Sequence, residues 1–245
     1  DVSKLEGIKV VDLSLFLPGP MLTMMMADQG ATVTKVEPLA GDPARDQAPF
    51  EGDTSVWFRN LNRGKASVRL DLKSEAGRDA LWALIDDADV FVEGFRPAFG
   101  VAALELTDFL HAFEAQGLDL GPHRLFDQAA QDGALAHHPA HDMAVQALAG
   151  FLSVNDGPDG IPVVPGVPGA DMAAGLTGLS AVLMALIGRE RTGKGDYIDC
   201  AMFDSMLPWC AHVAGRAIAG GKAPVSSQQR SLGGAAFYQV YETKD

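Results

Sequence analysis

The sequence predicts an α/β fold built on a parallel β-sheet. Two β-rich segments, residues 8–13 and 31–37, flank a helical segment at residues 21–29. A strand, a helix and a second strand so close together form a βαβ unit, whose two strands are parallel. A third β-rich segment, residues 88–93, follows an amphipathic helix at residues 75–86. This alternation is typical of an α/β domain.

Local residue patterns support these elements and indicate several more. Residues 16–20 contain two prolines and predict a loop before the first helix. Gly30 is expected to end that helix as its C-cap residue. Ser74 is a suitable N-cap for the helix at residues 75–86. We also expect strands at residues 68–72 and 197–201, a polar loop at 38–53, a long apolar helix at 171–191 and a helix at 203–219.

Composition and charge exclude several classes of protein. The 245 residues include 19 basic and 32 acidic ones, a net charge of −13 that repels nucleic acid and anionic membranes. Two cysteines cannot form a disulfide framework or a cysteine zinc site. The longest apolar run, residues 176–187, contains a glycine and is expected to be too short to span a bilayer. Charged residues interrupt the first apolar stretch, so we expect no signal peptide there. We therefore expect a cytoplasmic protein.

One segment of this acidic chain is basic. Residues 59–78 contain six basic and two acidic residues, a net charge of +4, whereas the rest of the chain carries −17. Such a segment could bind a phosphate-bearing ligand through charge-assisted hydrogen bonds. It could equally be a solvated surface. The turn after the first strand has no glycine-rich nucleotide motif, which argues against a nicotinamide oxidoreductase.

Two regions contain candidate catalytic residues. His137, His138 and His141 lie near Asp142, but their spacing is poor for zinc, and we expect no metal site. A histidine beside an acid can also serve in acid–base catalysis or simply make a structural hydrogen bond. Asp171 follows a stretch rich in glycine and proline and opens the long apolar helix, so it could be an N-cap or a nucleophile.

Short motifs recur in order along most of the chain. They lie at residues 5–13, 18–20, 27–31, 62–65, 71–73, 88–97, 140–142, 169–171, 190–195 and 238–242. Over about residues 1–97 and 131–245 the chain thereby resembles family III CoA-transferases, which include formyl-CoA and carnitine CoA-transferases and the α-methylacyl-CoA racemases. The resemblance implies a Rossmann-like sheet with helices on both faces and an interlocked homodimer.

The resemblance also implies a chemistry. Asp171 matches the family's catalytic aspartate, whose carboxylate attacks an acyl-CoA thioester to give a mixed anhydride and CoA thiolate. An acceptor carboxylic acid then resolves that intermediate. Coenzyme A is therefore a thioester substrate, with no permanently bound cofactor. The implied CoA-binding residues are Leu70, Asp71, Leu72, Lys73, Gly94, Phe95, Arg96, Ala140 and Asp142.

His141 keeps an alternative open. It stands where the racemases of the family have a histidine base, so that His141 and Asp171 could exchange a proton on opposite faces of an α-carbon. The breadth of the family favours the transferase.

The chain departs from the family in three places. Pro38 replaces a basic residue, and residues 98–130 have an atypical sequence that suggests a shifted reading frame. The family continues into a small C-terminal domain beyond the position of residue 245, and we expect that domain to be missing here. We accordingly expect one catalytic domain at residues 1–220 and the start of a linker at 221–245. These departures leave an inactive CoA-binding remnant as a further alternative.

Overall fold

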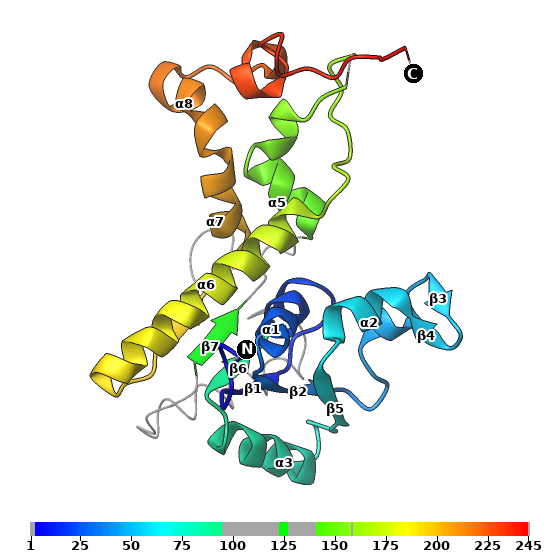
Figure 1. Cartoon of the computed structure of the whole chain (residues 1–245), viewed down its shortest axis with the longest axis vertical. Coiled ribbons are helices and arrows are strands. Elements are labelled where there is room, and N and C mark those ends of the chain that lie inside the picture. The colour runs from blue at the N-terminus through cyan, green and yellow to red at the C-terminus, as the bar shows by residue number, and fades with distance from the viewer. Residues whose placement is uncertain (1–2, 95–122, 127–140, 158, 245) are drawn as a thin grey trace. The chain divides into compact units, whose positions relative to one another are not determined.

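The structure, a computed structural model, describes residues 3–94, 123–126, 141–157 and 159–244 (Figure 1). Its contacts divide the chain into two units. The first comprises residues 1–139 and 174–201, and the second comprises residues 140–173 and 202–245. One division falls within helix α6 (Gly169–Thr192), and each unit is described by itself. The predicted domain boundary at residue 220 stays a prediction.

The first unit contains a six-stranded sheet in the order β5-β2-β1-β6-β7-β8, in which every pair of neighbours is parallel. Its strands are β1 (Lys9–Asp12), β2 (Thr32–Glu37), β5 (Lys65–Arg69), β6 (Val90–Val92), β7 (His123–Phe126) and β8 (Tyr197–Asp199). A two-stranded antiparallel ribbon joins β3 (Phe50–Glu51) to β4 (Thr54–Ser55). The helical segments are α1 (Pro18–Asp28), η1 (Pro43–Asp46), α2 (Val56–Asn62) and α3 (Glu75–Asp86), together with most of α6. The predicted α/β fold with a parallel sheet is confirmed.

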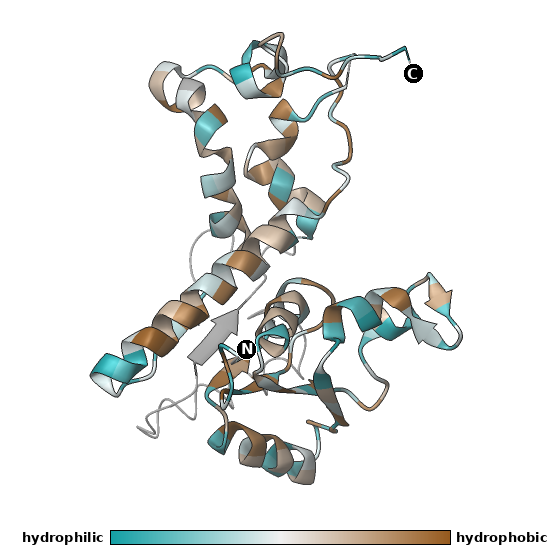
Figure 2. Cartoon of the chain, viewed as in Figure 1, coloured by the Kyte–Doolittle hydropathy of each residue, from teal (hydrophilic) through white to brown (hydrophobic). Residues whose placement is uncertain are grey.

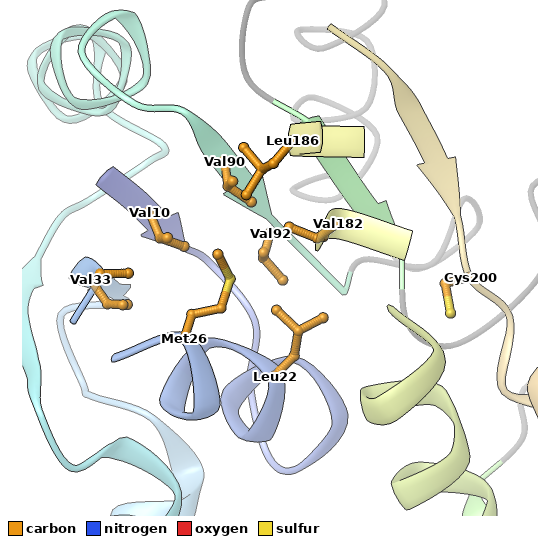
Figure 3. Close-up of a cluster of buried hydrophobic side chains, with 10 residues drawn as sticks. Val10, Leu22, Met26, Val33, Val90, Val92, Val182, Leu186 and Cys200 are labelled. Carbon is orange, nitrogen blue, oxygen red and sulfur yellow. The ribbon is translucent and has the colours of Figure 1, made fainter. Parts of the chain in front are cut away.

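Apolar residues cover both faces of this sheet because successive strand residues point to opposite sides. Val10 and Val33 pack with Leu22 of α1 and Val182 of α6 on one face (Figure 3). On the other face, Phe91 packs in a cluster with residues of α3. Helices α1 and α3 accordingly lie on opposite sides of the sheet (Figure 1), which confirms the expected arrangement.

Helix α1 begins earlier than the sequence predicted. Pro18 and Pro20 lie within its first turn, so the prediction of a loop over residues 16–20 is wrong for its last three residues. A proline is tolerated there because the first-turn N–H groups have no partner inside the helix. Gly30 ends the helix with a φ of 94°, as predicted.

Close contact between α1 and α6 depends on a glycine. A Cβ on Gly175 would lie 2.4 Å from Met21 Cε and 3.0 Å from the Pro18 carbonyl oxygen. The small residues of α6 therefore allow two helices on one sheet face to pack tightly.

Strand β5 and helix α3 differ in how well they were predicted. Helix α3 has the expected bounds, and the Ser74 hydroxyl accepts the expected bond from the Gly77 N–H at 3.1 Å. The strand expected at residues 68–72 instead spans Lys65–Arg69, because its register is set by pairing with β2. Residues 70–73 consequently form the turn after the strand.

Helix α6 is longer than predicted and runs through 24 residues. By length and composition it could cross a bilayer, so the expectation that this segment is too short is wrong. Val182 and Leu186 are nonetheless buried against the sheet, as in a core helix. Figure 2 shows a largely apolar helix with a hydrophilic C-terminal end, where Arg189 and Arg191 lie.

The second unit is helical. It contains α5 (Asp142–Leu148), η2 (Phe151–Val154), α7 (Met202–Met206), η3 (Leu207–Cys210), α8 (Ala211–Gly220), η4 (Ser226–Gln228), η5 (Arg230–Leu232) and the start of α6. Val154, Cys210 and Val213 form its small core. The single helix predicted at residues 203–219 is wrong, because Pro208 cannot donate a helical hydrogen bond and the chain there forms three short segments.

Buried ion pairs lie at the carboxyl ends of β1 and β2. Asp12 Oδ2 lies 2.9 Å from Lys65 Nζ, and Lys35 Nζ lies 2.9 Å from Asp42 Oδ2, with all four side chains at most 1% exposed. Burial opposes the ionisation of Asp12, but the charges of Lys65 and Lys35 and two hydroxyl hydrogen bonds outweigh it and lower the pKa of Asp12 to about 2. Lys35 also donates to the Ser14 carbonyl at 2.7 Å, so these pairs fix the loop that follows β1.

We expect Asp12→Asn to cost about 3–5 kcal/mol of unfolding free energy, because it leaves the Lys65 ammonium buried without a counter-charge. Denaturant titration at pH 7 measures this cost. The matched control is Asp87→Asn, which breaks the exposed pair with Lys9 and is expected to cost less than about 1 kcal/mol. Equal costs for the two variants would contradict this assignment.

Candidate active site

The site is built around the first turn of α6. Asp171 is the third residue of this helix, whereas the N-cap alternative would place it just before the helix. Its side chain is partly buried, and Ala170 and Ala173 in the same turn are completely buried. None of the described residues forms a hydrogen bond or ion pair with its carboxylate. That carboxylate is therefore available for chemistry.

Asp142, and not Asp171, caps the first turn of α6. Its Oδ1 accepts hydrogen bonds from the backbone N–H of Ala170 at 2.8 Å and of Asp171 at 3.2 Å. The N–H groups of a first helical turn have no partner within the helix, so this carboxylate supplies one. Asp142 itself is the first residue of α5, and it thereby ties the starts of two helices together.

Gln146 orients Asp142. One turn further along α5, its Nε2 donates to Asp142 Oδ2 at 2.6 Å, and its side chain is completely buried. A Cβ on Gly169 would lie 3.3 Å from Gln146 Oε1, so the absence of a side chain at Gly169 makes room for the amide. Both oxygens of Asp142 are consequently held in place.

The pKa of Asp171 is raised from 3.8 to about 7. Burial is the larger cause, because it removes water from the carboxylate, and the negative charge of Asp142 is the second. A carboxylate of such basicity is a stronger nucleophile than an ordinary aspartate, and it titrates near neutral pH.

His141 lies at the N-cap position of α5 and is exposed. Among the described residues it forms no hydrogen bond or ion pair with Asp171. The next residue, Asp142, accepts the Asp171 N–H, so His141 and Asp171 belong to the same region of the second unit.

Half of the basic residues in this segment are paired with acidic side chains. Lys65 is buried against Asp12, Arg63 pairs with Asp28, and Arg59 pairs with Glu51. Arg69 and Arg78 donate to backbone carbonyls. Within the part of the chain that the structure describes, Lys73 is the one basic side chain of the segment with no such partner, and it is exposed.

The predicted CoA-binding residues have different outcomes. Leu70, Asp71, Leu72 and Lys73 form the turn between β5 and α3, and Gly94 follows β6. Phe95, Arg96, Ala140, His137 and His138 lie outside the described residues, as does most of the atypical segment 98–130. No group of three metal-ligating side chains occurs among the residues that are described.

Sequence analysis missed Gln146 and the helix that carries it. A polar residue four positions after Asp142 would share its helix face, but α5 has only seven residues, too few for a helical periodicity to stand out.

Asp171→Asn should stabilise the folded chain at pH 8. The folded chain binds a proton at Asp171 more tightly than the unfolded chain, so stability falls as pH rises between about 4 and 7. Allowing for partial exposure, we expect a gain of about 2 kcal/mol at pH 8 that shrinks toward zero near pH 4. Thermal and denaturant unfolding at both pH values measure it. Asp204→Asn, at an exposed position of α7, is the control, and a gain of equal size there would contradict the assignment.

Comparison with known proteins gives consistent results. The chain is 36% identical over 245 residues to the acetyl-CoA:oxalate CoA-transferase of Acetobacter aceti, a match that covers 98% of this chain and 61% of that protein. It is 32% identical over 254 residues to the succinyl-CoA:glutarate CoA-transferase of Homo sapiens, with 100% of this chain and 55% of that protein covered. A CAIB/BAIF family protein from Brucella suis has a similar structure, with a TM-score of 0.78, 33% identity and coverage of 91% of this chain and 60% of that one.

The chain thus spans a little more than half the length of these relatives. The family pattern of CoA-transferase family III matches residues 5–245. On this match and these identities, the chain belongs to CoA-transferase family III.

Proposed function

We propose that this chain catalyses the transfer of CoA between carboxylic acids, with Asp171 as the nucleophile. One observation supports the proposal most strongly. The partly buried Asp171 carboxylate has a raised pKa and lies in the first turn of α6, where Asp142 caps the helix in its place. Membership of the family supports it, as do the names of its CoA-transferase relatives.

The chemistry follows from a carboxylate meeting a thioester. An oxygen of Asp171 attacks the acyl carbonyl, the carbon–sulfur bond breaks, and a mixed anhydride and CoA thiolate result. The thiolate then attacks the aspartyl carbonyl and releases the donor acid. An acceptor carboxylate repeats these steps in reverse order, which regenerates Asp171 and forms the new thioester. No proton, metal or redox partner is consumed.

The transferase is favoured over the racemase. The relatives from Acetobacter aceti and Homo sapiens are named as CoA-transferases. Because two of these relatives are named for oxalate and glutarate, we infer a dicarboxylic acid as acceptor.

The CoA-binding residues belong to the same proposal. The exposed ammonium of Lys73 suits a phosphate of CoA. We assign the remaining contacts to Leu70, Asp71, Leu72, Gly94, Phe95, Arg96, Ala140 and Asp142, as the family resemblance implies. A cytoplasmic homodimer is the proposed working form.

The covalent step can be trapped directly. We expect incubation with acetyl-CoA or succinyl-CoA, followed by hydroxylamine, to leave a hydroxamate on the tryptic peptide that contains Asp171, as detected by mass spectrometry. Asp171→Asn should abolish both this adduct and CoA transfer, whereas Asp204→Asn should retain them.

Three results would contradict the proposal. CoA transfer without an adduct would remove Asp171 as nucleophile. Acid-independent deuterium uptake at the α-carbon of (R)-2-methylacyl-CoA in D₂O would indicate the racemase, with His141 and Asp171 as the bases. CoA binding without turnover would indicate the inactive remnant.

A further inference from the structure

We propose that Asp142 is the positioning residue of Asp171: it fixes the first turn of α6 through two N–H groups and holds a negative charge beside the reactive carboxylate. This role is additional to the CoA contact proposed for Asp142 above, and its catalytic consequence rests on the proposed function.

Two hydrogen bonds connect the Asp142 carboxylate to the start of α6. One carboxylate oxygen receives both Ala170 N–H and Asp171 N–H, so the backbone of the nucleophile is itself bonded to Asp142. The Gln146 side chain donates to the other oxygen of Asp142, and this amide is itself completely buried. The nucleophile and its neighbour are therefore a rigid pair that spans α5 and α6.

Charge gives Asp142 a second effect. The positive end of a helix dipole normally favours an ionised acid in the first turn and lowers its pKa. Here Asp142 occupies the N–H groups that would supply this stabilisation and adds a like charge. Consistent with this, the pKa of Asp171 is raised by burial and by Asp142.

Within the part of the chain that the structure describes, few other titratable groups lie on the elements around Asp171. Asp171 is the one acid in the first turn of α6, and His141 precedes Asp142 at the exposed start of α5. Helix α7, which packs against α5, contributes Asp204, which is exposed. Of these groups, Asp142 is the one whose charge raises the pKa of Asp171.

Two substitutions separate the two effects of Asp142. Asp142→Asn removes the charge but keeps an oxygen that can accept the N–H bonds, and the Gln146 amide can turn over so that its otherwise unpartnered Oε1 accepts from the new amide group. Asp142→Ala removes both the charge and the bonds. Asp204→Asn removes one exposed charge from the same unit and serves as control. For each variant we would measure the thermal midpoint, the pH dependence of adduct formation with acetyl-CoA, and the titration of the Asp171 carboxyl carbon by ¹³C NMR, identified by its loss in Asp171→Asn.

We expect Asp142→Asn to unfold at nearly the temperature of the unchanged chain but to shift the titration of Asp171, and the pH midpoint of adduct formation, downward by about one unit or more. Asp142→Ala should show the same shift and a lower thermal midpoint. Asp204→Asn should change neither quantity.

An unchanged titration of Asp171 in Asp142→Asn would overturn the proposal, and so would an equal shift in Asp204→Asn. If Asp142→Ala fails to fold, Asp142→Asn still decides the matter. The NMR titration needs no turnover. If the unchanged chain forms no adduct, the proposed function fails, while the titration still reports whether Asp142 acts on Asp171.

Discussion

The bonds from Asp142 to the first turn of α6 determine the character of the candidate site. They satisfy N–H groups that would otherwise lack partners, and so allow α6 to begin at Gly169. They also leave Asp171 free of a structural role, although aspartate at a helix start is usually a cap. The candidate carboxylate thus lies in the first turn of a helix of 24 residues.

Two buried aspartates show how their neighbours decide chemical behaviour. Asp12 is completely buried, yet two lysines and two hydroxyls lower its pKa to about 2. Asp171 is less buried, but its charged neighbour is another carboxylate, and its pKa is raised to about 7. The first remains an anion and stabilises the carboxyl end of β1. The second can change its charge near neutral pH, as expected of a reactive group.

Much of the fold could be predicted, because the strands β1, β2 and β6 and the helix α3 have strong local patterns. The errors have local causes. Pro18 and Pro20 favour a loop by their sequence pattern, but the first turn of a helix also accepts proline. Asp171 is a candidate by sequence, but the sequence pattern does not separate nucleophile from cap, because the residue that caps α6 lies 29 positions away. The basic segment suggested a broad phosphate site, whereas ion pairs such as Arg63–Asp28 occupy three of its six basic residues.

The central claim is that an oxygen of Asp171 passes through the covalent intermediate, and isotope transfer tests it most directly. The chain would be given acetyl-CoA and a dicarboxylic acceptor labelled with ¹⁸O in its carboxyl groups, and the peptide containing Asp171 would then be weighed. The account predicts that ¹⁸O from the acceptor enters the Asp171 carboxyl group during turnover. Formation of the new acyl-CoA with no label in this peptide would contradict it.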